Sequence, residues 1–158
     1  MPPGYPDVEG LVPHRRPSLL LIEVRSSSEE RIVCAGAIPA DHPLADDSGA
    51  PAVLGIELAA QAAAAGEGLR RWHESPGLAA PVQGYLVSVA RARFRTSLLP
   101  VGEPLVAQVR CVATAGRLSS YVGVVSREGT ARAHLVVCRI ATLRIGAGTQ
   151  PEVPRPRT

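Results

Sequence analysis

A long alanine-rich stretch constrains the fold of this chain more than any other feature. It runs from Gly49 to Ala65 and continues to about Trp72, before Ser75-Pro76-Gly77 interrupts it. Alanine has the highest helix propensity of any residue, and Pro51 suits a first helical turn, where its missing N–H is not needed. Asp47-Ser48 offers a capping side chain. The sequence therefore predicts one long helix over about 50–72.

Two polar residues interrupt the apolar part of this helix. Glu57 and Gln61 are four positions apart, so they lie on the same helix face. A carboxylate among isoleucine, leucine and alanine is costly to bury unless the protein needs it there, which makes Glu57 the main candidate for chemistry. The polar residues between Glu67 and Glu74 are expected to reach solvent at the far end of the helix.

Apolar runs before and after the helix indicate strands. Two short runs, 18–25 and 31–38, are expected to form a hairpin. Four longer runs follow the helix, and short glycine-containing turns between the last three predict an antiparallel meander; these runs are 82–96, 105–113, 118–126 and 131–145. The second half of the first long run alternates, which predicts one buried face. Strands with one helix across them form an α+β layer, in which the sheet or a second subunit must cover the helix.

The domain organisation follows from length and composition. A chain of 158 residues fits one domain with a substantial core. We expect a flexible N-terminus over 1–9, one domain over 10–147, and a disordered proline-rich tail over 148–158.

Composition excludes several classes of protein. The chain is 46% hydrophobic and 20% charged, as in soluble globular proteins. It lacks both an apolar run of membrane-spanning length and a signal-peptide pattern, so we expect a cytoplasmic protein without membrane association. With a net charge of +3 and 3% aromatic residues, it lacks the features of a nucleic-acid-binding protein, but it is compatible with an acidic partner such as a carrier protein.

The remaining reactive side chains show no metal or redox pattern. Cys34, Cys111 and Cys138 are dispersed in apolar runs, which is typical of reduced thiols in a core. His42 lies among three aspartates, but their spacing fits no metal-ligand pattern, and no glycine-rich phosphate loop is present. We therefore expect neither a metal nor a cofactor.

Four motifs resemble those of hotdog-fold (R)-3-hydroxyacyl-carrier-protein dehydratases. Residues 11–21 resemble the family's "LPHR-x-P-x-LLLD" opening, and residues 51–62 resemble its helix motif "PGVLxxE-x-MAQA". Residues 82–86 and 101–105 lie where the family has "GYL" and "vG-x-x-L". The match covers most of residues 10–145 and is closest to the dehydratase-like proteins of aryl-polyene-type gene clusters. It implies a hotdog fold, in which a curved antiparallel sheet wraps around one long central helix.

The resemblance implies an activity. In the family, a histidine and a helix carboxylate from partner subunits dehydrate a 3-hydroxyacyl thioester on acyl carrier protein to the trans-2-enoyl thioester. One group takes the C2 proton and the other protonates the departing hydroxyl. Desolvation is expected to raise the pKa of a buried glutamate, so that it exchanges protons near neutral pH as histidine does. The partners implied are the phosphopantetheine-linked carrier protein and a second hotdog subunit, in a homodimer or a heterodimer.

Glu57 and one of two histidines are the catalytic candidates. His42 precedes Glu57 by 15 positions, close to the family's spacing, but residues 40–44 lack the glycine and phenylalanine of the family's "GHFPGHP" loop. His14 lies in the first motif between two prolines, and the sequence leaves the choice between these histidines open. Gln61 is expected to orient Glu57, and the amides of Val53, Leu54 and Gly55 to hold the thioester oxygen.

Two other functions remain open at this point. A hotdog thioesterase shares the helix carboxylate and would hydrolyse the thioester instead. Alternatively, the departures in the histidine loop suit a non-catalytic subunit that partners an active dehydratase.

Overall fold

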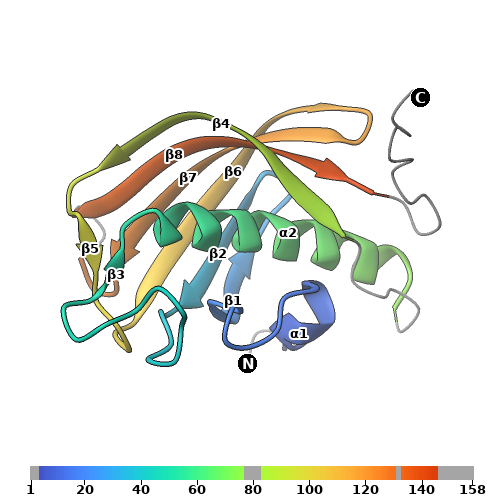
Figure 1. The fold of residues 1–158 in the computed structure, drawn as a ribbon. Coiled ribbons are helices and arrows are strands. Elements are labelled where there is room, and N and C mark those ends of the chain that lie inside the picture. The colour runs from blue at the N-terminus through green and yellow to red at the C-terminus, as the bar shows by residue number, and fades with distance from the viewer. Residues whose placement is uncertain (1–3, 77–82, 131–132, 146–158) are drawn as a thin grey trace, which may run out of the picture.

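The long helix α2 (Leu54–Glu74) lies against the inner face of a curved antiparallel sheet in the computed structural model (Figure 1). The structure describes residues 4–76, 83–130 and 133–145. Within these ranges the arrangement is the hotdog fold expected from the sequence. None of the helices found there is long and apolar enough to cross a membrane. The proposed tail over 148–158 falls outside the described residues.

Six strands form the main sheet in the order β1-β2-β6-β7-β8-β4, and every neighbouring pair is antiparallel. The first two strands form the predicted hairpin, and β6, β7 and β8 form the predicted meander. Gly116, at a φ of 59°, supplies the left-handed turn residue between β6 and β7. The strands are β1 (Leu21–Ser27), β2 (Arg31–Gly36), β4 (Gly84–Phe94), β6 (Leu105–Ala115), β7 (Leu118–Arg127) and β8 (His134–Arg144).

The core lies between α2 and the inner face of the sheet. Alternate residues of the central strands point inward, among them Leu105, Ala107 and Val109 of β6. The helix contributes small side chains and approaches the sheet closely: a Cβ on Gly123 would lie 2.9 Å from the Cβ of Ala59. The alanine content of the helix therefore has a packing reason as well as a propensity reason.

The N-terminal segment covers the side of α2 that the sheet leaves open (Figure 1). A short helix, α1 (Val8–Leu11), begins at Asp7, whose side chain accepts a hydrogen bond from the amide of Glu9. Val8 and Leu11 are buried in the core. A flexible N-terminus was expected over 1–9, because a helix of four residues is too short to show helical periodicity in the sequence.

The start of α2 differs from the prediction. Ala50–Pro51 form a short strand, β3, which pairs with β5 (Leu98–Leu99), and the helix begins at Leu54. Val53 occupies the N-cap position, and no side chain caps the helix. The expectation that Pro51 and Asp47-Ser48 start the helix was therefore wrong. Pairing with β5 determines the conformation of Pro51, and the sequence around it contains no signal of so distant a partner.

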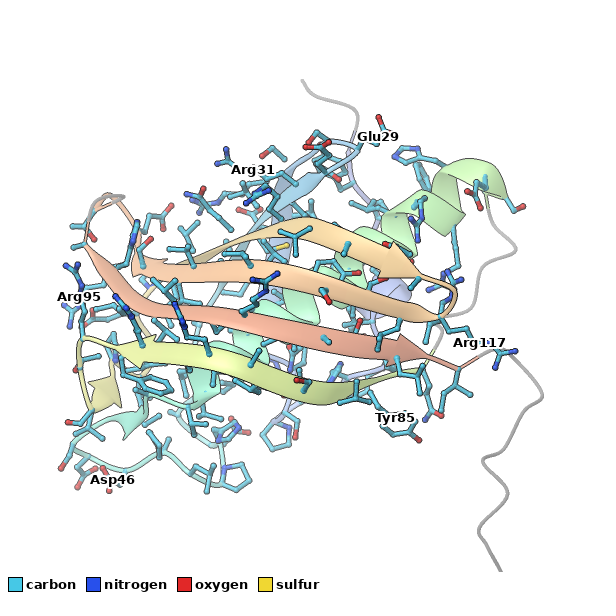
Figure 2. All side chains as sticks on the ribbon, turned by 90° about the horizontal axis from the view of Figure 1, so that it is seen from above. Glu29, Arg31, Asp46, Tyr85, Arg95 and Arg117 are labelled. Carbon is cyan, nitrogen blue, oxygen red and sulfur yellow. The ribbon has the colours of Figure 1, made fainter. Side chains whose placement is uncertain are left out.

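Strand β4 forms an exposed edge of the sheet, since it pairs only with β8 in the described residues. Figure 2 shows this strand along one border, with Tyr85 near its beginning and Arg95 just beyond its end. Its large apolar side chains are exposed, among them Tyr85, Val87, Val89 and Phe94, at 44–49%. The predicted buried face of this strand is therefore not formed within one chain.

Candidate active site

His14 lies in the segment that connects α1 to β1. The guanidinium of Arg15 donates hydrogen bonds to the carbonyl oxygens of Val12 at 3.0 Å and His14 at 2.7 Å. The amides of Ser18 and Leu19 both donate to the carbonyl of Arg15 at 3.0 Å. These bonds fold the proline-flanked motif into a tight turn, which presents the imidazole toward α2.

Glu57 in the first turn of α2 meets this histidine. The Nε2 atom of His14 lies 3.2 Å from Oε1 of Glu57, and the two side chains are 31% and 38% exposed. The Nδ1 atom of His14 is buried without a hydrogen-bond partner among the described residues. A buried polar atom left without a partner is uncommon in folded proteins and is often associated with a functional site.

Gln61 holds the carboxylate from the next turn of the helix. Its side chain is fully buried, and its Nε2 donates to Oε1 of Glu57 at 2.9 Å. The same amide nitrogen donates to the carbonyl of Ser18 at 2.8 Å, and Oε1 of Gln61 accepts from the amide of Leu20 at 2.9 Å. Gln61 therefore joins the helix to the segment that carries His14.

These donors lower the pKa of Glu57 below its ordinary value. The hydrogen bond from His14 is the largest cause; desolvation acts in the opposite direction, and the hydrogen bond from Gln61 lowers the pKa further. The expectation that burial would raise this pKa was therefore wrong, because two donors outweigh the desolvation of the carboxylate. Glu57 is ionised at neutral pH.

His42 lies in the loop before β3 and takes a different position. Its Nδ1 accepts a hydrogen bond from the amide of Leu44 at 3.1 Å. Its charge contributes weakly to the lowered pKa of Glu57, after the effects of His14 and Gln61. The described structure thus brings His14 into direct contact with Glu57, whereas His42 interacts with the carboxylate only electrostatically.

The start of α2 lies beside the carboxylate. The amide of Gly55 donates to the carbonyl of Ala52 at 2.9 Å, and the amide of Ile56 donates to that of Val53 at 3.0 Å. The amide of Gly55, one of the three proposed to hold a thioester oxygen, therefore already has an acceptor in this structure.

A pocket of about 90 Å³ opens beside the pair and runs along α2. Its helix wall consists of residues at helical spacing, with Ala60 and Ala64 between a polar beginning at Glu57 and a polar end at Glu67 and Arg71. The opposite wall comes from the beginning of β4 and the end of β8. The lining residues are His14, Glu57, Ala60, Ala64, Glu67, Arg71, Gln83, Gly84, Leu86, Thr142 and Arg144.

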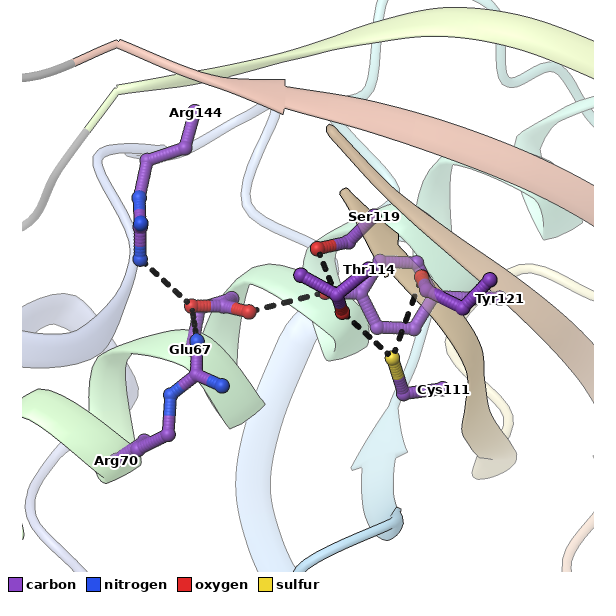
Figure 3. A network of polar contacts seen from close by, with 8 residues as sticks. Glu67, Arg70, Cys111, Thr114, Ser119, Tyr121 and Arg144 are labelled. Atoms are coloured by element: carbon purple, nitrogen blue, oxygen red, sulfur yellow. Dashed lines mark hydrogen bonds and ion pairs between the residues drawn. The ribbon is translucent and has the colours of Figure 1, made fainter. Parts of the chain in front are cut away.

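The far end of the pocket contains a polar network that the sequence analysis did not find (Figure 3). Oε1 of Glu67 accepts from the hydroxyl of Tyr121 at 3.2 Å, and Oε2 pairs with Arg70 and, at 3.5 Å, with Arg144. Burial, with the charge of Glu67, raises the pKa of Tyr121 to about 12. Glu67 is 21% exposed, so the prediction that this residue simply reaches solvent was wrong. The sequence did contain a signal for this network: residues 57, 60, 64, 67 and 71 are three or four positions apart, so they lie on one face of the helix.

The described residues offer no metal centre, because they contain no group of three or more His, Cys, Asp or Glu side chains close enough to bind an ion. What the site can do chemically is move protons between an imidazole and a carboxylate beside a narrow pocket.

The fold and this pair of side chains define a hotdog-fold protein. The chain belongs to the ApeP-like family, described as ApeP dehydratases, whose model matches residues 6–144. None of the curated proteins matches it significantly. Among solved structures, the dehydratase heterocomplex ApeI:P from Xenorhabdus doucetiae is 24% identical over 90% of this chain and 93% of the other, with a TM-score of 0.78.

More distant structures share the fold. A homologue of HP0420 from Helicobacter felis is 13% identical over 89% of this chain and 90% of the other, with a TM-score of 0.60. A point mutant of the phenylacetic acid degradation protein PaaI from Thermus thermophilus is 22% identical over 78% of this chain and 92% of the other, with a TM-score of 0.53. At this identity the likeness concerns the fold alone.

Proposed function

We propose that this protein removes water from an (R)-3-hydroxyacyl thioester carried on acyl carrier protein and releases the trans-2-enoyl thioester. The observation that carries the proposal is the 3.2 Å contact between Nε2 of His14 and Oε1 of Glu57 at the wall of the pocket. The reaction needs one group to accept the C2 proton and another to protonate the hydroxyl that leaves C3. A paired imidazole and carboxylate meet both needs, and membership of a dehydratase family supports this reaction class.

The lowered pKa of Glu57 suggests which residue has which role. An ionised carboxylate has no proton to give, so Glu57 acts as the base toward C2 and protonated His14 acts as the acid toward the C3 hydroxyl. The C2–H electrons form the new double bond as the C3–O bond breaks, and the hydroxyl leaves as water with the His14 proton. Transfer of a proton from Glu57 back to Nε2 of His14 restores the pair.

The beginning of α2 would stabilise the negative charge that develops on the thioester oxygen. Val53 and Leu54 have amides at the positive end of the helix dipole, one turn before Glu57. Gln61 does not titrate, so its role is to fix the position of the carboxylate oxygen that both donors approach.

The experiment is a dehydration assay with 3-hydroxyacyl thioesters on carrier protein. Wild type is compared with Glu57→Gln, His14→Ala and His42→Ala, with His73→Ala at the end of α2 as a control outside the pocket. We expect kcat to fall at least 100-fold in Glu57→Gln and His14→Ala, and to change less than threefold in the control. Circular dichroism checks that each variant is folded.

The product separates the competing functions. An enoyl product on an intact thioester supports the dehydratase, whereas a free acid with the hydroxyl retained would indicate a thioesterase. A larger loss in His42→Ala than in His14→Ala would overturn our choice of histidine.

The exposed strand β4 supports assembly with a second hotdog subunit. Exposed edges with large apolar side chains pair with other strands, and β4 carries Tyr85, Val87 and Val89 on such an edge. The relative from Xenorhabdus doucetiae is described as a heterocomplex, which makes a heterodimer a candidate here. Light scattering at micromolar concentration should give a dimer mass for the protein alone or for its mixture with a second hotdog chain; a monomer in both would contradict this assembly.

A non-catalytic role in such a heterodimer is the second candidate function. It is favoured by the edge strand that one chain leaves uncovered and by the heterocomplex of the relative. The second function is supported if the purified chain shows no dehydratase activity with any substrate and Glu57→Gln does not reduce the activity of the reconstituted heterodimer.

A further inference from the structure

The outer face of the sheet, which points away from α2, carries exposed arginines on β4, β6 and β8. They are Arg91, Arg93, Arg110 and Arg139. Their neighbours along each strand point inward: Ala92 packs against the core, and Val109 and Cys138 are buried in it. Figure 2 looks onto this outer face, with Arg31 toward the β2 border and Tyr85 toward the β4 border.

The strand register arranges four arginines in one row across five strands. Arg91 of β4 pairs with Arg139 of β8. Arg110 of β6 pairs with Arg31 of β2. Val122 of β7 lies between the two pairs and is opposite both Arg139 and Arg110. Because neighbouring strands are about 4.8 Å apart, this arginine row, formed by Arg91, Arg139, Arg110 and Arg31, spans about 19 Å.

The strands that the arginine row crosses supply no carboxylate. Strands β2, β4, β6, β7 and β8 contain neither Asp nor Glu. On the adjoining strand β1, Glu23 already pairs with Arg25. Acidic residues close in sequence occur only at the β2 end of the row, where Glu29 and Glu30 lie in the turn before the strand. Within the described residues, no arginine of the row forms an ion pair.

The arginine row places like charges directly opposite one another twice. Side chains at paired positions of antiparallel strands point to the same face, with Cβ atoms about 5 Å apart, and like charges there destabilise the pair. Arg91 opposes Arg139 in this way. Arg31 opposes Arg110 in the same way. The sheet therefore carries an electrostatic cost that a negatively charged partner on this face would remove.

We propose that the arginine row binds an acidic helix of a partner protein, which lies across the strands. A helix rises about 5.4 Å per turn, close to the spacing of the strands, so one side chain per turn can meet each strand. Positions 1, 4, 8, 11 and 15 of a helix share one face and span about 21 Å. Carboxylates at positions 1, 4, 11 and 15 would meet the four arginines, and an apolar side chain at position 8 would meet Val122.

The composition and location of this face favour a protein partner. Val122, Val124 and Val137 are half-buried on it, so apolar surface is interleaved with the charges, as in protein interfaces. A second copy of this chain in symmetric contact would place arginines against arginines. Pairing of the β4 edge with another hotdog subunit would use backbone groups and leave the outer face accessible. The inference does not depend on the proposed function, because the arginine row lies on the side of the sheet opposite α2 and the pocket.

Fluorescence anisotropy with labelled alanine-based helical peptides and the full chain in its native assembly tests the proposal. The first peptide has glutamates at positions 1, 4, 11 and 15 and leucine at position 8. The second has glutamines in place of the glutamates, and the third has the composition of the first with its glutamates dispersed around the helix. We expect the first peptide to bind about 10-fold more tightly than either control, and salt to weaken this binding.

Variants connect this binding to the arginine row. Arg139→Gln and Arg110→Gln should each weaken binding of the first peptide about threefold or more. Arg117→Gln is the matched control, because Arg117 is exposed in the turn after β6, outside the row, and its loss changes the net charge equally. Arg139→Gln also removes the like-charge pair with Arg91, so it should unfold at the same or a higher urea concentration than wild type. A purely structural role of Arg139 would instead lower that concentration.

The results that would overturn the inference are specific. Equal binding of the first peptide and either control overturns it, as does binding that survives both Arg139→Gln and Arg110→Gln in folded protein. Phosphatidylglycerol vesicles and a DNA duplex are tested in the same way. If either binds more tightly than the first peptide and loses binding in these two variants, the arginine row serves a lipid surface or a nucleic acid, and the acidic helix is excluded.

Discussion

The side-chain amide nitrogen of Gln61 lies 2.9 Å from Oε1 of Glu57, the same oxygen that Nε2 of His14 approaches to 3.2 Å. Gln61 also bonds the backbone at Ser18 and Leu20, just before β1. One buried amide therefore fixes both the carboxylate and the chain segment that carries the histidine. The proposed catalytic pair is positioned by the fold as a whole rather than by α2 alone.

Replacing Gln61 with methionine should reduce both stability and activity. The substitution keeps the side-chain volume but leaves the amide of Leu20 and the carbonyl of Ser18 without their buried partner, at a cost of about 2–4 kcal/mol. Chemical denaturation measures this loss. Gln108→Met is the matched control, since Gln108 is half-buried on β6 and bonds the exposed Arg31; its effect should stay within about 0.5 kcal/mol. Equal losses in both variants would show that Gln61 has no special role.

Acidification should reduce the stability advantage of wild type over Glu57→Gln. The pKa of Glu57 is lowered in the folded protein, so its ionised form stabilises the fold above the unfolded value of about 4.5, and this contribution is lost as the pH falls through the lower folded pKa. We expect the difference in unfolding free energy between the two proteins to be constant from pH 6 to 7 and to shrink below about pH 4.5. Urea denaturation over this range measures it. A difference that grows on acidification would mean that the pKa is raised instead.

The sequence predicted much of this fold because its signals are local. Alanine content and the Glu57–Gln61 spacing defined the helix and its polar face, and apolar runs separated by short glycine-containing turns predicted the meander of β6, β7 and β8. The choice between His14 and His42 stayed open because it depends on how the segment before β1 folds back onto α2. That contact is made by Gln61 across more than forty positions, and no periodicity encodes it.

The polar end of the pocket was missed for a similar reason. Glu67 and Arg71 were interpreted as solvent-facing because polar residues at the end of a helix usually are. The partners of Glu67, Tyr121 and Arg144, come from β7 and β8, and only the pairing of these strands beside α2 brings them there. The helical spacing from Glu57 to Arg71 was visible in the sequence, but its meaning depends on the neighbouring strands.

The three cysteines should differ in reactivity. Burial raises the pKa of Cys34 to about 12 and that of Cys138 to about 11, so neither forms a thiolate near pH 8. Cys111 is only half-buried. We expect iodoacetamide at pH 8 to label Cys111 at least tenfold faster than the other two in native protein, as followed by peptide mass spectrometry. Labelling in denaturant, where all three should react alike, is the control, and fast native labelling of Cys34 would contradict the full burial of this residue on β2.

Two glycines of α2 provide a matched pair that tests how α1 positions the candidate active site. A Cβ on Gly68 would lie 2.6 Å from the carbonyl oxygen of Leu11, whereas a Cβ on Gly66 would meet Ile32 at an ordinary 3.6 Å. Alanine stabilises a helix by up to about 1 kcal/mol relative to glycine, so Gly66→Ala should be neutral or stabilising. Gly68→Ala must displace the backbone of α1, and we expect it to lower stability by about 1–3 kcal/mol despite the same gain in propensity.

The same two glycine variants distinguish an effect on stability from an effect on catalysis. Leu11 is three residues before His14, so a displaced α1 moves the imidazole away from Glu57. Below the unfolding temperature, Gly68→Ala should therefore lower kcat by at least tenfold while KM changes little, and Gly66→Ala should keep the wild-type values. Thermal unfolding and steady-state kinetics on both variants provide the measurement. Wild-type kcat in a destabilised Gly68→Ala would show that the histidine does not depend on α1 for its position.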